Sequence, residues 1–146
     1  MQTSIGLPTD IAIRFGKEWI TSLTQDFDEL TRADILLVFS ELLSNAVKAT
    51  DRVSKNETIW ICFSTCGERV VLLVQDNGKG FTKEMELFKP DYYLKRKPVD
   101  PMKQSGRGIL IAKENCSRLT YRRHNNGWIA KAEWGIDAGG DECVWQ

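Results

Sequence analysis

The sequence lacks a long apolar run, an excess of charge of one sign and a recognisable export signal. No stretch of about 18 apolar residues occurs, so no segment is expected to span a membrane. Lys and Arg together number 20, as do Asp and Glu, whereas a nucleic-acid-binding protein would carry a basic excess. Residues 1–6 show no basic patch followed by an apolar stretch. We therefore expect a cytoplasmic protein that binds neither membranes nor nucleic acid.

Histidine and cysteine are too sparse for the common metal and nucleophile sites. Cys62 and Cys66 do not have zinc-ribbon spacing, and without an export signal all four thiols are expected to be reduced. Cys62 falls in a strand-like run and is expected in the core. His124, the only histidine, lies where a strand end and a turn are predicted, without a serine or cysteine nucleophile signature. The sequence thus disfavours a zinc site, a disulfide framework and a nucleophilic hydrolase.

The 146 residues predict a single domain. Its core is expected over about 8–134, with a lid over about 81–105 and a frayed tail over 135–146. Periodicity predicts a short strand over 3–7, helices over 8–23 and 31–51, strands over 58–63 and 69–75, a helix over 108–115, and strands over 118–123 and 128–134. This order indicates an α+β fold, a two-layer sandwich with helices packed on one face of a mixed, mainly antiparallel sheet.

Two packing details accompany this prediction. Thr31 is expected to cap the second helix, with Asp34 three residues later as a weak form of the capping box. Phe15, Trp19 and Trp60 are large aromatic side chains, and we expect them in the core rather than at an interface.

The second helix carries a polar face on an otherwise apolar pattern. Glu41 and Asn45 are four residues apart, so they share one face of the helix, and Ser44 and Lys48 flank them. A carboxylate, a carboxamide and an ammonium on one face could hold a ligand. The simpler interpretation is a solvated face, which most helices have.

Two glycine-containing segments lie further along the chain. The segment DNGKG at 76–80 directly follows the most apolar strand, and its glycines would let the backbone approach a ligand, although a plain turn has the same composition. The segment SGRGI at 105–109 opens the last helix, where free backbone N–H groups and the positive end of the dipole suit phosphate. The chain has neither a dinucleotide fingerprint nor a P-loop.

Together, in this order, the three segments resemble the N box, G1 box and G2 box of the GHKL ATPase superfamily. The resemblance runs from about residue 8 to residue 134 and implies the Bergerat-type ATP-binding fold. Within the superfamily, the chain looks most like the small anti-sigma factor serine/threonine kinases. It shares with them its length, the SELLSNAV type of N box and the SGRGI opening of the last helix.

This resemblance implies ATP and Mg²⁺ as cofactors. It implies that Asn45 coordinates the magnesium and that Glu41 is the general base, accepting a proton from a serine hydroxyl or a water. Asp76 would accept a hydrogen bond from the adenine amino group. The nucleotide-binding set implied by the three boxes is Asn45, Lys48, Asp76, Gly78, Gly80, Gly106, Arg107, Gly108 and Ile109.

Within that set, Gly78 and Gly80 would let the chain pass under the base, and Gly106 and Gly108 would cradle the phosphates. Arg107 or Lys48 could offset charge on the terminal phosphate. Two departures from the anti-sigma kinase pattern stand out. The sequence Lys48-Ala49-Thr50 occupies the region where many of these kinases have a histidine, and Gly127-Trp128 stands where the last hairpin often has Gly-Thr.

The leading functional hypothesis is an ATP-dependent serine/threonine protein kinase in a partner-switching pathway. The resemblance implies a small STAS-type anti-sigma factor antagonist as its substrate, a sigma factor as a second partner, and a homodimer. One alternative is an ATP-dependent binding or switch module that sequesters a partner without significant turnover. Two others are the catalytic half of a histidine kinase acting in trans and a nucleotide-free α+β scaffold.

Overall fold

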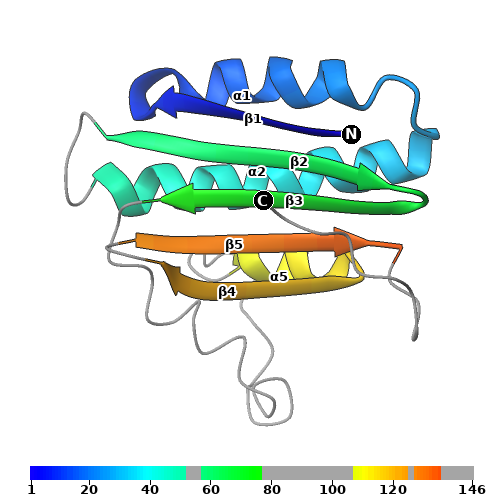
Figure 1. Ribbon diagram of the computed structural model, residues 1–146. Helices are drawn as coiled ribbons and strands as arrows, with labels where there is room; N and C mark the ends of the chain where they lie inside the picture. Colours follow the sequence, from blue (N-terminus) through cyan, green and yellow to red (C-terminus); the bar gives the residue numbers. More distant parts are fainter. Residues whose placement is uncertain (52–56, 77–106, 125–126, 136–146) are drawn as a thin grey trace, which may run out of the picture.

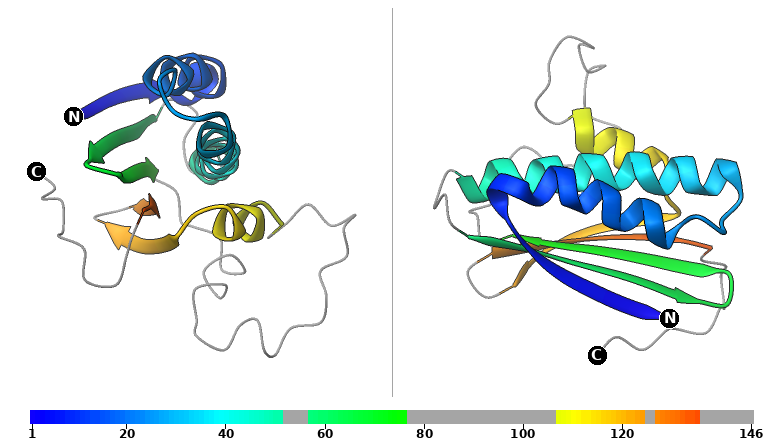
Figure 2. Two further views of the ribbon diagram at one scale, coloured as in Figure 1. Left: turned by 90° about the vertical axis from the view of Figure 1, so that its right-hand side faces the viewer. Right: turned by 90° about the horizontal axis from the view of Figure 1, so that it is seen from above.

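The computed structural model describes residues 1–51, 57–76, 107–124 and 127–135. Their elements, in chain order, are β1 (Gln2–Pro8), α1 (Thr9–Leu23), α2 (Glu29–Asp51), β2 (Thr58–Cys66), β3 (Arg69–Asp76), α5 (Arg107–Glu114), β4 (Arg118–His124) and β5 (Gly127–Trp134). The three helices form one layer and the strands form the other (Figures 1 and 2). The predicted α+β two-layer sandwich is therefore confirmed.

The five strands form one sheet in the order β1-β2-β3-β5-β4. Each neighbouring pair of these strands is antiparallel, so the described sheet contains no parallel pairing. The central strand is β3, whose apolar run suits a position flanked by strands on both sides. The strand β2 extends past the predicted end at Phe63, because Ser64 and Thr65 pair with Val71 and Val70.

The hydrophobic core lies between α2 and the sheet. Alternate residues of the strands face the helices, so Phe63 of β2 and Leu72 of β3 are fully buried. From the other side, Ile35, Phe39 and Leu42 of α2 are also almost completely buried. Their spacing of three and four residues forms one continuous stripe on the helix. This contact fixes the rotation of α2 and therefore decides which of its side chains face away from the sheet.

Helix α1 packs closely against α2 at a glycine. Its buried positions include Ala12, Gly16 and Ile20, each four residues from the next, whereas Phe15 is 43% exposed. A methyl group on Gly16 would lie only 2.8 Å from the Leu43 Cδ2 atom, so the glycine is what lets α1 approach α2 this closely. The prediction that Phe15 lies in the core is wrong, because the buried face of α1 is the one that carries Ala12, Gly16 and Ile20.

Two further predictions about packing need correction. Trp60 is 53% exposed and covers the cross-strand residue Gly6 on the helix-free face of the sheet. Cys62 lies on the same face and is only half-buried. The side chains of β2 alternate between the two faces of the sheet, and Ile59 and Ile61 are the ones that face the helices. Trp19 is partly buried and packs against the core.

The second helix begins two residues earlier than predicted. It starts at Glu29, and the carboxylate of Asp28 accepts a hydrogen bond from the backbone N–H of Thr31 at 3.0 Å. Asp28 is thus the capping side chain, and the assignment of that role to Thr31 is wrong. The hydrogen bonds that Thr31 donates lower the pKa of the Asp28 carboxyl.

The helix-free face of the sheet carries a buried carboxylate, that of Glu133 on β5. Its two oxygens accept hydrogen bonds from Arg69 and Arg118, each at 2.7 Å, and Lys131 Nζ lies 3.5 Å from Oε1. Burial raises the pKa of the Glu133 carboxyl, but the two arginines and the lysine outweigh it and lower the pKa to about 2. This cluster links β3, β4 and β5.

Among the described helices, none is long and apolar enough to cross a membrane. The predicted lid over 81–105 and all of the predicted tail except Gly135 lie outside the described residues.

Candidate functional site

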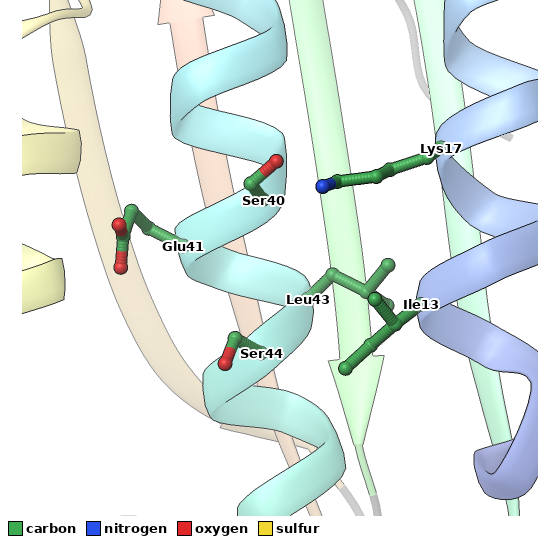
Figure 3. Close-up of a pocket in the computed structure, with 6 residues that line it drawn as sticks. All are labelled: Ile13, Lys17, Ser40, Glu41, Leu43 and Ser44. Carbon is green, nitrogen blue, oxygen red and sulfur yellow. The ribbon is translucent and has the colours of Figure 1, made fainter.

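The polar face of α2 that the sequence indicates is present and is directed away from the sheet. Glu41 and Asn45 are both half-buried and lie one turn apart. In Figure 3 the Glu41 side chain points away from α1. The core stripe of α2 causes this arrangement, because anchoring Phe39 and Leu42 in the core leaves positions 41 and 45 facing α5.

Helix α5 reaches this polar face through a glycine in its first turn. A Cβ atom on Gly108 would collide with the Oε2 atom of Glu41, and it would lie 3.8 Å from the Asn45 Nδ2 atom. Any side chain at position 108 would therefore have to displace the carboxylate. Gly108 thus meets Glu41 and Asn45 at one place, although it follows them by more than sixty positions in the sequence.

The carboxamide of Asn45 has unused hydrogen-bonding capacity. Its Nδ2 atom is buried and has no hydrogen-bond partner among the described residues. A buried donor without a partner costs about 1–3 kcal/mol, which a ligand at this position would recover. A half-turn of the Asn45 amide about its Cβ–Cγ bond would exchange the two atoms and place the oxygen there instead. Oxygen is the kind of ligand atom that Mg²⁺ prefers.

The described residues hold no cluster of three or more His, Cys, Asp or Glu side chains that could bind a metal by itself. Magnesium commonly uses one or two protein ligands and completes its shell with water and phosphate oxygens. The donor set at Glu41 and Asn45 fits that manner of binding: two oxygen-bearing side chains beside a helix N-terminus that suits phosphate.

The N-terminus of α5 adds positive potential to the site. The helix begins at Arg107 and has no acidic residue in its first turn. Its first turn lies against Glu41 and Asn45 of α2, so the carboxylate of Glu41 is the acidic group next to the free backbone N–H groups of that turn. Ile109 is 1% exposed and anchors the helix in the core, so it could contribute only its backbone to a ligand. Lys48 is exposed further along α2.

Asp76 marks a second part of the candidate site. It is the last residue of β3, is 2% exposed, and lies at the end of the sheet where α2 also ends (Figure 1). Its partner on β5 is Trp128, whose ring stacks on Tyr121 with centroids 5.3 Å apart and planes 13° from parallel. A buried carboxylate beside a flat aromatic pair suits a planar heterocycle that carries an amino group.

The remaining predicted residues are not placed by the structure. Gly78, Gly80 and Gly106 lie outside the described residues, and so does the side chain of Arg107. Of the predicted set, the structure brings together Glu41, Asn45 and Gly108, and it places Asp76 at the end of the neighbouring strand β3.

Sequence reasoning missed a hollow beside Glu41, between α1 and α2. It measures about 270 Å³ and is lined by Ile13, Lys17, Ser40, Glu41, Leu43 and Ser44 (Figure 3). A neighbouring hollow of about 310 Å³ shares Lys17 and Ser40 with it. The available signal was the four-residue spacing of Ile13, Lys17 and Thr21, which places the three on one side of α1.

The family model for histidine kinase-, DNA gyrase B-, and HSP90-like ATPases matches residues 31–138. The matched region begins near the start of α2 and includes β2, β3, α5, β4 and β5, whereas β1 and α1 precede it. It therefore contains Glu41, Asn45, Asp76 and Gly108. No curated protein matches the chain.

Proposed function

Because the chain belongs to the histidine kinase-, DNA gyrase B-, and HSP90-like ATPases and is an ATP-binding module of the GHKL type, we propose that it is a serine/threonine protein kinase of the anti-sigma factor type. Its substrate in this proposal is a small STAS-type antagonist protein, its second partner is a sigma factor, and it acts as a homodimer. The resemblance of its three boxes to those kinases supports the proposal.

The observation that carries the proposal is the meeting of Glu41, Asn45 and Gly108. A carboxylate able to accept a proton lies next to an amide with spare capacity and next to the start of a helix. Transfer of a phosphoryl group needs chiefly positioning and charge stabilisation, so few side chains are required. Lys48 on α2 is a further cation for the terminal phosphate.

In the proposed reaction, the hydroxyl oxygen of the acceptor forms a bond to the γ-phosphorus of ATP. The bond from that phosphorus to the bridging oxygen breaks, and ADP leaves with the electron pair. Glu41 takes the hydroxyl proton, and Asn45 holds Mg²⁺, which when bound neutralises charge on the phosphates. The N–H groups at the start of α5 bind phosphate oxygens.

Asp76 sets the orientation of the nucleotide in this proposal. Its carboxylate accepts a hydrogen bond from the adenine amino group, and the buried Trp128, stacked on the partly buried Tyr121, excludes water on that side. Discrimination against guanine follows, because guanine presents an oxygen where adenine presents the amino group.

The test follows label from γ-labelled ATP to a purified antagonist protein. With Glu41→Gln, transfer should fall on the order of 10²–10⁴-fold, the usual contribution of a general base, while ATP binding is retained. Glu18→Gln, an exposed glutamate on α1, is the matched control and should leave transfer unchanged.

Binding is measured separately, by thermal unfolding with Mg-ATP. Saturation at 100 times the dissociation constant should stabilise the protein by about 2.7 kcal/mol. Stabilisation without label transfer, unaffected by Glu41→Gln, would support the ATP-dependent switch module and reject the kinase.

A further inference from the structure

The two hollows beside α2 form one groove, which we name the α1–α2 groove. Its walls are Ile13, Lys17 and Thr21 on α1 and Leu37, Ser40 and Ser44 on α2. The two hollows are continuous, because both are lined by Lys17 and Ser40. From Ile13 to Thr21 the groove follows about two turns of α1, or roughly 12 Å.

The groove has the properties of a protein-binding surface. Ile13 is 45% exposed and Leu37 is 40% exposed, so an apolar side chain lies toward each end. Ser40 lies between these ends and Ser44 lines the end with Ile13, and their small side chains leave room for a partner to approach the backbone of α2. Leu43 of α2, against which Gly16 of α1 packs, also lines this hollow.

Two charged residues line the groove, Lys17 and Glu41, and the Glu41 carboxylate points to the other side of α2. Lys17 extends from α1 toward Ser40 (Figure 3), and among residues 1–51, 57–76, 107–124 and 127–135 it forms no ion pair. An ammonium group between two apolar positions matches a segment with apolar anchors and one acidic side chain between them. A single cation is too little for a polyanion, which would need several phosphate contacts.

The groove is continuous with the candidate active site. Glu41 lines the hollow with Ile13 and Lys17, while its carboxylate points to the other side of α2, next to Gly108. A chain segment seated in the groove therefore has the proposed general base at its edge. To reach the carboxylate, its neighbouring residues have to pass over α2, but not over α1 or the sheet.

We propose that the α1–α2 groove binds an amphipathic helical segment of the phosphoryl-acceptor protein, with an acidic side chain of that segment paired to Lys17. The groove lies between two helices, and a third helix packs there with apolar anchors three and four residues apart. This inference rests on the proposed kinase function, because it treats the occupant as the protein that brings a hydroxyl to Glu41.

The test uses the full chain and a displayed library of amphipathic helices. The library has leucine anchors three and four residues apart and random residues between them. Binders selected on the wild-type protein should be enriched in Asp or Glu at the central position. Ile13→Asp and Lys17→Glu should each weaken these binders at least about tenfold, and replacing the central acid by Lys should restore binding to Lys17→Glu.

Two control variants match the test variants. Phe15→Asp alters a side chain on the same helix that is 43% exposed, close to the 45% of Ile13, and Phe15 does not line the groove. Arg14→Glu reverses a neighbouring exposed charge that also lies outside the lining. Both should bind the selected helices within about twofold of the wild type.

Three results would overturn the inference. The first is that no selected helix binds Ile13→Asp more weakly than it binds Phe15→Asp. The second is that the selected helices are not enriched in Asp or Glu at the central position. The third is conversion of a wild-type dimer to a monomer by Ile13→Asp in sedimentation, which would assign the groove to a second copy of the chain. Stabilisation by Mg-ATP is measured on each variant, so failure of nucleotide binding is distinguished from failure of docking.

Discussion

Two glutamates in this protein are shielded from water in different ways. Glu133 on the helix-free face of the sheet is fully buried, and two arginines occupy both of its oxygens at 2.7 Å. Glu41 on α2 is half-buried, lies against Gly108, and forms no ion pair within the described residues. The Glu133 carboxylate is thus paired with two arginines, whereas the Glu41 carboxylate is held next to Gly108 without a paired cation among the described residues.

The difference separates a structural role from a functional one. A buried carboxylate is tolerated when cations and hydrogen bonds compensate for its lost hydration, and Glu133 has such compensation. A general base must keep an oxygen free to accept a proton, so full compensation would disable it. The surroundings of each glutamate, and not its burial alone, therefore indicate what it does.

The largest expected effect on stability comes from Glu133. Glu133→Gln removes the buried counter-charge of Arg69, whose side chain is 12% exposed, and of the half-exposed Arg118, so the free energy of unfolding should fall by about 3–5 kcal/mol. Glu41→Gln should change it by no more than about 0.5 kcal/mol. Urea denaturation of both variants measures this contrast, and equal losses would show that the two carboxylates do not differ in role.

Acid should remove part of the same stabilisation. The pKa of Glu133 is about 2 in the folded protein, against 4.5 for an ordinary glutamate, so its contribution is present above about pH 4.5 and lost as the pH falls toward 2. The difference in unfolding free energy between wild type and Glu133→Gln should therefore shrink over this range. A constant difference across the range would contradict the low pKa.

The two glycines that contact α2 offer an intermediate test. Gly16→Ala places a methyl group 2.8 Å from Leu43 Cδ2 and 3.2 Å from Phe39 Cζ, so it should destabilise the protein by about 1–3 kcal/mol. Gly108→Ala meets the movable end of the Glu41 side chain, which can rotate away, so stability should change by less than about 1 kcal/mol.

Activity should respond in the opposite order. Gly108→Ala displaces the Glu41 carboxylate without changing its charge, so phosphoryl transfer should fall at least about tenfold. Gly16→Ala should leave the rate per folded molecule unchanged. The measurement is label transfer at a temperature where both variants are folded, and a larger loss with Gly16→Ala would reverse the assignment of the two contacts.

The smallest effect is expected at Asp28, a carboxylate that is neither buried nor near the site. Its hydrogen bond with Thr31 lowers its pKa, so Asp28→Ala should reduce stability only slightly and only above the range where Asp28 titrates. Thermal unfolding at neutral and at low pH measures the difference. A loss as large as that of Glu133→Gln would mean that a local cap matters as much as the buried cluster.

The fold could be predicted largely from the sequence, because its signals are local. The apolar runs of β2 and β3 and the stripe of α2 each follow one period, and each element formed near the predicted place. Within α1, only the core placement of Phe15 failed, because two series of residues both repeat every four positions: Ile11, Phe15 and Trp19, and Ala12, Gly16 and Ile20. Only the contact with α2 decides between these two faces.

The site was predictable in part for a similar reason. Glu41 and Asn45 share a helix face through local spacing, whereas their contact with Gly108 depends on how α5 packs against α2. The cluster around Glu133 joins residues from three strands, and no local pattern connects positions 69, 118 and 133. The α1–α2 groove likewise exists only after both helices are packed.

The stack of Tyr121 on Trp128 also gives the protein a built-in optical reporter. Trp128 is buried opposite Asp76, whereas Trp60 is half-exposed on the far face of the sheet. Indole emission shifts with the polarity of its surroundings, so Trp128 and Trp60 emit differently. In a variant with Trp19, Trp60, Trp134 and Trp145 replaced by Phe, the fluorescence of Trp128 would follow the arrival of a base beside Asp76 in real time, without a label on either molecule.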